Sequence, residues 1–164
     1  MTDPTPPGAD WVLVPVAPGN AFQDHNLEVW ARLDGEEPVI GFRVLPQHCN
    51  PRKVCHGGLM MTFFDFLLPT VSRFDGDADD SFTPTVSITT NFMAPASLGD
   101  WLEGRARTLR RTSSLVFIEG TVRSGDTIVA QASGIFKRRK PDGRIARTAA
   151  LFERMREARA GAAS

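Results

Sequence analysis

Apolar and polar residues alternate along two early segments of the chain. The alternation runs from Leu27 to Leu33 and again from Val39 to Leu45, with the polar residues 34–38 between the two segments. Period-two alternation is typical of strands with one buried face, and Asp34-Gly35 is a common beginning of a hairpin turn. The two segments therefore predict a β-hairpin.

The apolar stretch that follows has a different pattern. Residues 58–74 are apolar almost throughout and show no period-two alternation. The stretch is too long for an ordinary strand, so its length predicts a buried helix that is covered on most sides. Pro69 cannot donate a backbone hydrogen bond to the carbonyl of Asp65, and we expect a kink or the last helical turn near it. The polar residues Asp75 to Ser81 predict a loop.

The rest of the chain predicts four strands and a final helix. Strict alternation from Thr83 to Phe92 puts Thr85 on one face with Ser87, Thr89 and Asn91, and Val86 and Phe92 on the other. Further strands are expected at Trp101–Arg110, Ser114–Arg123 and Thr127–Arg138, and a largely exposed helix at Arg147–Ala160. This order predicts an α+β fold in which a strongly curved antiparallel sheet wraps around one long central helix, followed by a C-terminal helix.

Composition suggests one domain with two short extensions. The chain has 164 residues, of which 41% are hydrophobic, enough for a single core. We expect an N-terminal arm at residues 1–24, the main domain at residues 25–140 and a C-terminal helical tail at residues 141–164. The first residues lack the pattern of a secretory signal, and Leu59–Val71 is too short to span a membrane. Cys49 and Cys55 are expected to be free thiols, which favours a cytoplasmic protein.

The charges argue against a polyanionic partner. The chain has 19 basic and 19 acidic residues, and no aromatic residues are interleaved with basic ones, so a nucleic-acid partner is not expected. Residues 1–100 carry 5 basic and 13 acidic residues, whereas residues 101–164 carry 14 and 6. The two halves could pair across a subunit interface, or they could be two solvated faces of one fold.

Chemistry is concentrated at the start of the long helix. Asp65 is the one charge in its apolar stretch, and His56-Gly57-Gly58 precedes that stretch directly. A carboxylate inside a core is costly unless it is paired or performs chemistry. The free N–H groups of a helix start can stabilise a developing oxyanion. A donor and a carboxylate at fixed helical separation predict an acyl-transfer site.

Together with this element order, the motif resembles a known enzyme family. His-Gly-Gly, Asp65 nine residues after His56, and the later segment S-I-T-T-N-F-M-A-P-A-S-L-G-D are similar to the hotdog-fold acyl-CoA thioesterases. The type most similar is the phenylacetic-acid-degradation (PaaI-like) type, which includes the Arthrobacter kind of 4-hydroxybenzoyl-CoA thioesterase. The resemblance implies a homodimer with two sites at its interface, often paired into a tetramer. It implies a coenzyme A thioester as substrate, and neither metal nor cofactor.

The resemblance also assigns roles to residues. Asp65 is expected to be the nucleophile or the general base, and the Gly57 N–H to polarise the thioester carbonyl. Asn50 and His56 are expected to line and order the site, and Thr85 of the partner subunit to position water. For His56, holding its loop is favoured over acting as a base. Substrate contacts are expected from Gly58, Met61, Thr62 and Leu68 for the acyl group, and from Arg111, Arg138 and Arg139 for the phosphates.

Three other functions were weighed against this one. A zinc site built from His48, Cys49, Cys55 and His56 does not fit the usual ligand spacing. A hotdog hydratase would need a His/Asp pair in another context, which the sequence does not contain. A non-catalytic hotdog module that binds acyl-CoA remains the alternative, and it predicts binding without turnover. The basic residues near Arg138 fit CoA phosphates and strand-end solubility equally well.

Overall fold

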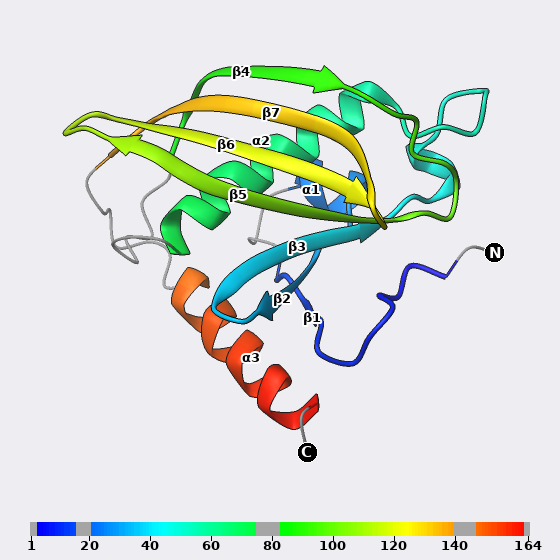
Figure 1. The fold of residues 1–164 in the computed structure, drawn as a ribbon, viewed down its shortest axis with the longest axis horizontal. Helices are drawn as coiled ribbons and strands as arrows, with labels where there is room; N and C mark the ends of the chain where they lie inside the picture. Colours follow the sequence, from blue (N-terminus) through cyan, green and yellow to red (C-terminus); the bar gives the residue numbers. More distant parts are fainter. Residues whose placement is uncertain (1–2, 16–20, 75–82, 140–146, 163–164) are drawn as a thin grey trace.

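A single antiparallel sheet contains all the strands of the described residues. The computed structural model describes residues 3–15, 21–74, 83–139 and 147–162 (Figure 1). Within them the sheet has the order β1-β2-β3-β5-β6-β7-β4, and all neighbours are antiparallel. The strands are β1 (Val12–Leu13), β2 (Trp30–Asp34), β3 (Glu37–Arg43), β4 (Thr85–Phe92), β5 (Trp101–Arg111), β6 (Leu115–Ser124) and β7 (Thr127–Lys137). The helices are α1 (Ala21–Asn26), the short 3-10 helix η1 (Pro46–His48), α2 (Gly57–Phe74) and α3 (Arg147–Ala162).

The predicted fold class is confirmed. Strands β2 and β3 form the expected hairpin, which Asp34 and Glu37 close around Gly35 at a φ of 61°. Strands β5, β6 and β7 match the three predicted later strands to within a few residues. The sequence pattern did not predict β1, α1 or η1. The loop predicted at Asp75–Ser81 lies outside the described residues.

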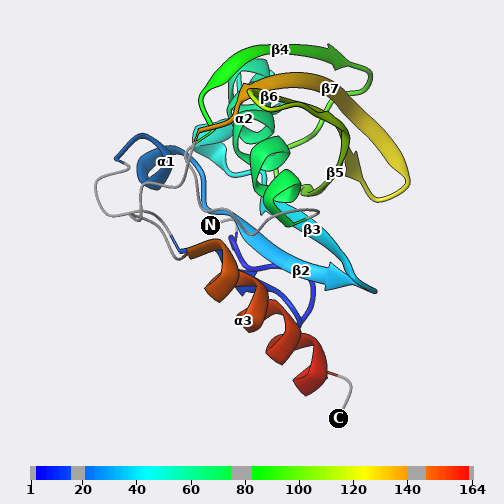
Figure 2. The same ribbon diagram turned by 90° about the vertical axis from the view of Figure 1, so that its left-hand side faces the viewer.

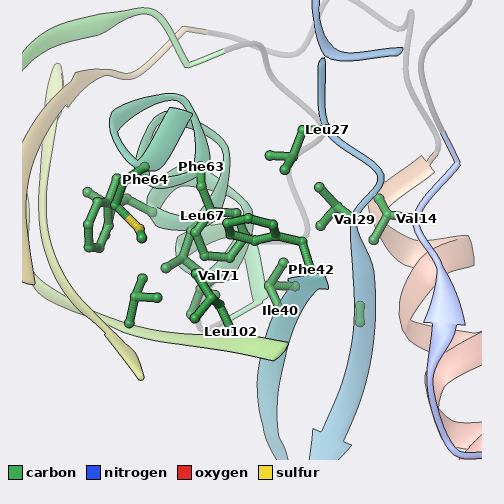
Figure 3. Close-up of a cluster of buried hydrophobic side chains, with 14 of the residues drawn as sticks. Val14, Leu27, Val29, Ile40, Phe42, Phe63, Phe64, Leu67, Val71 and Leu102 are labelled. Atoms are coloured by element: carbon green, nitrogen blue, oxygen red, sulfur yellow. The ribbon is translucent and has the colours of Figure 1, made fainter. Parts of the chain in front are cut away.

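Helix α2 lies inside the concave face of the sheet. Figure 2 shows β4, β7, β6, β5 and β3 curving around it. The helix packs closely because Gly104, Gly120 and Gly134 lie under it on β5, β6 and β7, where an added Cβ would meet side chains of α2 at 2.6–3.0 Å. Phe63, Leu67 and Val71 fill the space toward Phe42 and Leu102 (Figure 3). The sheet thus buries the inner side of α2.

Pro69 does not end the helix. Helix α2 continues from Pro69 for five more residues to Phe74, so of the two expectations, a kink or the last turn, the last turn at Pro69 is wrong. Pro69 is itself buried, and tertiary packing offsets the backbone hydrogen bond that proline cannot make. Phe63, Phe64, Leu67 and Leu68 are all fully buried around it, which favours continuing the helix.

Both ends of the chain add to this core. Strand β1 pairs with β2, and Trp11 just before β1 packs edge-on against Trp101, with ring centroids 5.0 Å apart. Helix α3 packs on β2 and on the end of α2, where the rings of Phe74 and Phe152 are 4.1 Å apart. The predicted C-terminal helix is confirmed, but one of its faces is buried through Leu151, Phe152 and Met155. No helix within the described ranges is long and apolar enough to cross a membrane.

Candidate active site

The first turn of α2 leaves one backbone donor free. His56 caps the helix: its Nδ1 accepts from the Gly58 N–H at 2.9 Å, and its carbonyl accepts from Leu59 and Met60 at 3.0 and 3.2 Å. Three of the first four N–H groups are therefore used by His56. The Gly57 N–H has no acceptor in the part of the chain that the structure describes. A single unpaired donor at the positive end of a helix can hold a developing oxyanion.

The loop before the helix is ordered by Asn50. Its Oδ1 accepts from the backbone N–H groups of Arg52 and Val54 at 2.9 and 3.3 Å. The Asn50 carbonyl also accepts from the Lys53 N–H, which closes a tight turn with Lys53 at a φ of 59°. Asn50 thus acts through the loop backbone. Lys53 holds a left-handed conformation that glycine adopts more easily.

The carboxylate of Asp65 is exposed rather than buried. It lies on the side of α2 that faces strand β4 and the solvent, so the expectation of an acid enclosed by the core is wrong for the single chain. Its Oδ1 accepts a hydrogen bond from the Thr85 Oγ1 at 2.5 Å. Thr85 was expected from a partner subunit, but here it contacts Asp65 of its own chain. The bond orients one carboxylate oxygen and leaves the other available for chemistry.

A β-bulge turns Thr85 toward the helix. The register of β4 against β7 shifts between Thr85 and Ser87, so one extra residue lies at Val86. Strict alternation puts Thr85 and Phe92 on opposite faces of the strand, and the bulge brings them to the same face. Thr85 contacts Asp65 at one end of β4, and Phe92 lies beside Gly57 at the other. Strand β4 therefore follows the exposed side of α2 along the whole candidate site.

Phe92 is a site residue that alternation alone did not predict. A Cβ placed on Gly57 would meet three atoms of the Phe92 ring at 3.3–3.7 Å, yet 55% of Phe92 is exposed. Met61 on α2 and Met93, which follows Phe92, are about half exposed, and Val86 is exposed in the bulge. The signal in the sequence was the segment N-F-M, in which two large apolar residues follow each other at the end of a strand.

The predicted acyl-contact residues separate into two groups. Gly58 and Met61 are exposed, and Thr62 is half-buried with its Oγ1 donating to the Gly58 carbonyl at 3.0 Å. Leu68 is fully buried, with its two methyl groups against Gly120 and Gly134. Leu68 is therefore a core residue in this chain and not part of the exposed side of α2.

The three arginines predicted to bind phosphates lie at the far end of α2. Arg111 donates to the carbonyl and the Oγ of Ser72, and Arg138 donates to the Thr112 carbonyl at 2.8 Å. Ser72 is fifteen residues after Gly57, about 22 Å along the helix axis. Arg111 thus satisfies the C-terminal end of α2, whereas Arg139 is exposed. Within one chain these arginines are far from the Gly57 N–H.

His48 and the two cysteines form a structural unit beside the site. The His48 Nδ1 accepts from the Leu45 N–H at 3.0 Å, and burial lowers the pKa of this imidazole. The backbones of Cys49 and Cys55 form an antiparallel β-bridge between two short segments, and both side chains are free thiols. Burial raises the pKa of Cys55 to about 12 and also raises that of Cys49. No group of three metal-ligating side chains is assembled in the described ranges.

Sequence and structure comparisons identify the family. The model of the Thioesterase superfamily matches residues 53–131. The Pseudomonas aeruginosa protein PA0474, provisionally named an esterase, is 33% identical over 98 residues, which are 60% of this chain and 72% of that protein.

Solved structures show the same fold. PaaI of E. coli, from the phenylacetic acid degradation operon, has a TM-score of 0.62 at 19% identity, over 76% of this chain and 88% of PaaI. Mouse thioesterase superfamily member 2 has a TM-score of 0.62 at 21% identity, over 71% of this chain and 86% of that one. The chain belongs to the thioesterase superfamily, and its hotdog fold is the fold of PaaI.

Proposed function

We propose that this protein is an acyl-CoA thioesterase whose site is shared by two copies of the chain. The observation that carries the proposal is the free Gly57 N–H at the start of α2, next to an exposed face that also holds Asp65. Hydrolysis consumes a thioester and water, and it releases a carboxylic acid and the CoA thiol. Membership of the thioesterase superfamily supports the reaction class.

The two groups supply the two needs of the reaction. The Gly57 N–H and the positive end of α2 stabilise the charge that develops on the thioester oxygen. Asp65 either attacks the carbonyl carbon and forms a mixed anhydride, which water then hydrolyses to the acid and free Asp65, or takes a proton from the attacking water. In both routes the C–S bond breaks and the thiolate leaves with the electron pair. Thr85 orients the Asp65 carboxylate through the 2.5 Å hydrogen bond.

The separation of Gly57 and Asp65 along α2 supports a site that is shared with a second copy. The two residues are eight positions apart, about 12 Å along the helix axis. One thioester needs a donor about 3 Å from its oxygen and an attacking atom about 3–3.5 Å from its carbon. These distances place the two groups closer together than α2 holds them. In the proposed dimer, the Asp65 that serves a given Gly57 belongs to the other subunit.

The edge of the sheet supports this dimer. Strand β4 is an edge strand with β7 as its one neighbour in the described sheet, and most of its residues are exposed. An open edge with half-exposed apolar side chains, here Val86 and Phe92, is a surface that another chain readily covers. Antiparallel pairing of two copies through β4 would bring the N-terminus of one α2 toward the Asp65 region of the other. We take this homodimer as the minimum active unit.

A pair of substitutions at Gly57 isolates the backbone donor. Gly57→Pro removes the N–H, and proline is well tolerated at the first position of a helix. Gly57→Ala adds a comparable Cβ next to Phe92 but keeps the N–H, so it is the matched control. Loss of one oxyanion donor costs about 100- to 1,000-fold in kcat. We expect the proline variant to fall by that factor relative to the alanine variant, measured by release of the CoA thiol.

Asp65→Asn tests the carboxylate in the same assay. The variant keeps the shape of the side chain but removes its charge, and we expect turnover to fall by at least about 100-fold. Wild-type rates in this variant would show that Asp65 has no chemical role. If the wild-type protein binds acyl-CoA thioesters but hydrolyses none of a broad panel, it is a binding module and not an enzyme. A monomeric mass in active wild-type protein would refute the shared site.

A further inference from the structure

We propose that Cys49 and Cys55 are a redox-active pair of thiols, which low-molecular-weight disulfides oxidise reversibly to an intrachain disulfide. This modification site lies in the loop before α2, and neither thiol takes part in the proposed hydrolysis. In the oxidised protein the disulfide locks the loop that leads into Gly57. The chain has two cysteines in all, so within one chain each has a single possible partner.

The backbone holds the two cysteines directly opposite each other. Cys49 and Cys55 form an antiparallel bridge. Backbone hydrogen bonds flank the bridge on both sides, from Asn50 to Val54 at 2.9 Å and from His56 to His48 at 2.8 Å. The cysteines are therefore the non-hydrogen-bonded pair, in which Cα atoms are about 4.5 Å apart and the side chains lie on the same face. A disulfide needs Cα atoms about 4.4–6.8 Å apart, so the bridge meets this requirement without a change of register.

The surroundings of the two thiols also suit a disulfide. Cys55 is 9% exposed and belongs to the core, and the half-buried Cys49 packs against that core. Burial, and after it the neighbouring Cys49 thiol, raises the pKa of Cys55 to about 12, as expected for two thiols close together. The Sγ of Cys49 donates to the Leu45 carbonyl at 3.4 Å, and that of Cys55 to the His56 carbonyl at 3.9 Å. Because thiols are weak donors, the disulfide replaces two weak hydrogen bonds.

The oxidation proceeds by two thiol–disulfide exchanges. The thiolate of Cys49, the more exposed cysteine, attacks one sulfur of glutathione disulfide and forms a mixed disulfide, and one glutathione thiolate leaves. Cys55 then loses its proton and attacks the Cys49 sulfur, which releases the second glutathione. The two cysteines lose two electrons and two protons, and one glutathione disulfide becomes two glutathione thiols.

The disulfide closes a short loop whose tip is exposed. Pro51, Arg52 and Lys53 are exposed between the two cysteines, and Cys55 is two residues before Gly57. A cross-link at the base of the loop removes the open conformations that a protease needs. Trypsin should therefore cleave native oxidised protein after Arg52 and Lys53 at least about threefold more slowly than reduced protein.

Intact mass after treatment of the native protein with glutathione disulfide tests the site. The reaction is run at about pH 8.5, because burial raises the pKa of both thiols and slows the exchange at neutral pH. We expect a single chain that has lost two hydrogens, and dithiothreitol should restore the original mass. After denaturation and digestion, the segments before and after Arg52 should remain joined until the disulfide is reduced.

Two matched variants test the order of attack. Cys55→Ser keeps the more exposed thiol and should accumulate the mixed disulfide with one glutathione. Cys49→Ser leaves the buried thiol and should react at least about tenfold more slowly. Equal rates in the two variants would contradict Cys49 as the attacking thiol.

Three outcomes in wild type would overturn the proposal. They are a stable glutathione adduct without an intrachain disulfide, a disulfide between two chains on a non-reducing gel, and an intrachain disulfide that forms in urea but not in native protein. Equal cleavage of the loop in both redox states would refute the lock, with cleavage after the exposed Arg139 as the internal control. None of these measurements uses hydrolysis, so their failure is separate from failure of the proposed function.

Discussion

Replacing Leu68 by alanine distinguishes a core residue from a pocket residue. The spacing of three from Asp65 suggested that Leu68 contacts substrate, but in the structure Leu68 is 0% exposed. Its methyl groups occupy the space above Gly120 and Gly134, which have no side chains that could fill a cavity. Leu→Ala at buried sites costs about 2–5 kcal/mol, and the cost is highest where the surroundings cannot collapse. We therefore expect a loss in the upper part of that range, about 3–5 kcal/mol.

Urea unfolding measures this loss, with all variants at one protein concentration because association adds to apparent stability. The urea concentration at the unfolding midpoint should fall, while the slope of the free energy of unfolding against urea concentration stays unchanged. The melting temperature should drop by about 2–4 °C for each kcal/mol of lost stability. Met61→Ala is the contrasting variant, because Met61 is exposed and should cost less than about 1 kcal/mol. A Leu68→Ala protein with near-wild-type stability and an altered acyl preference would refute the assignment of Leu68 to the core.

Three further predictions concern the core and its buried groups. Because burial lowers the pKa of His48 in the folded chain, the unfolded chain takes up the proton first as the pH falls below about 6.5. The free energy of unfolding should therefore decrease below that pH, and urea unfolding at pH 7.5, 6.5 and 5.5 measures the decrease. His48→Gln should flatten this dependence of stability on pH. The pKa of about 12 predicts that Cys55 in native protein reacts slowly with iodoacetamide at pH 8 and rapidly in urea, as read by peptide mass spectrometry; rapid native labelling would contradict its burial. Gly104→Ala puts a Cβ 2.6 Å from the Leu67 Cδ2 and should cost about 1–3 kcal/mol, with a smaller cost in a Leu67→Ala background.

The elements with a clear period were predictable from the sequence. The β2–β3 hairpin, the long helix and the three later strands followed from alternation, length and turn residues. Strand β1 was not predictable because its two residues are too short to show a period, and it exists through pairing with β2. Pro69 argued for a helix end, but the packing of the surrounding buried residues outweighs its local cost. The differences at β1 and Pro69 both come from tertiary contacts, which cannot be inferred from the sequence of one segment.

The candidate site was predictable in its residue types but not in its geometry. His56, Gly57 and Asp65 were found from their motif, and Gly57 now stands out because His56 uses the neighbouring N–H groups. The orientation of Thr85 depends on a bulge that alternation cannot show. Leu68 lies about 60° around the helix from Asp65, on the side that the sheet covers. A spacing of three was therefore too coarse to separate the exposed side from the core.

The glycines under α2 have a consequence for how this protein could acquire new substrates. Gly104 and Gly120 fit the inner side chains of the helix so closely that changes there must be matched on two elements at once. The outer side, with Met61 and Phe92 about half exposed in the single chain, should tolerate single substitutions without loss of the fold. If the proposed function holds, single mutations on this side should alter substrate preference one residue at a time while the fold stays intact. Directed evolution that is limited to the outer side should yield many folded variants, whereas libraries on the inner side should yield few.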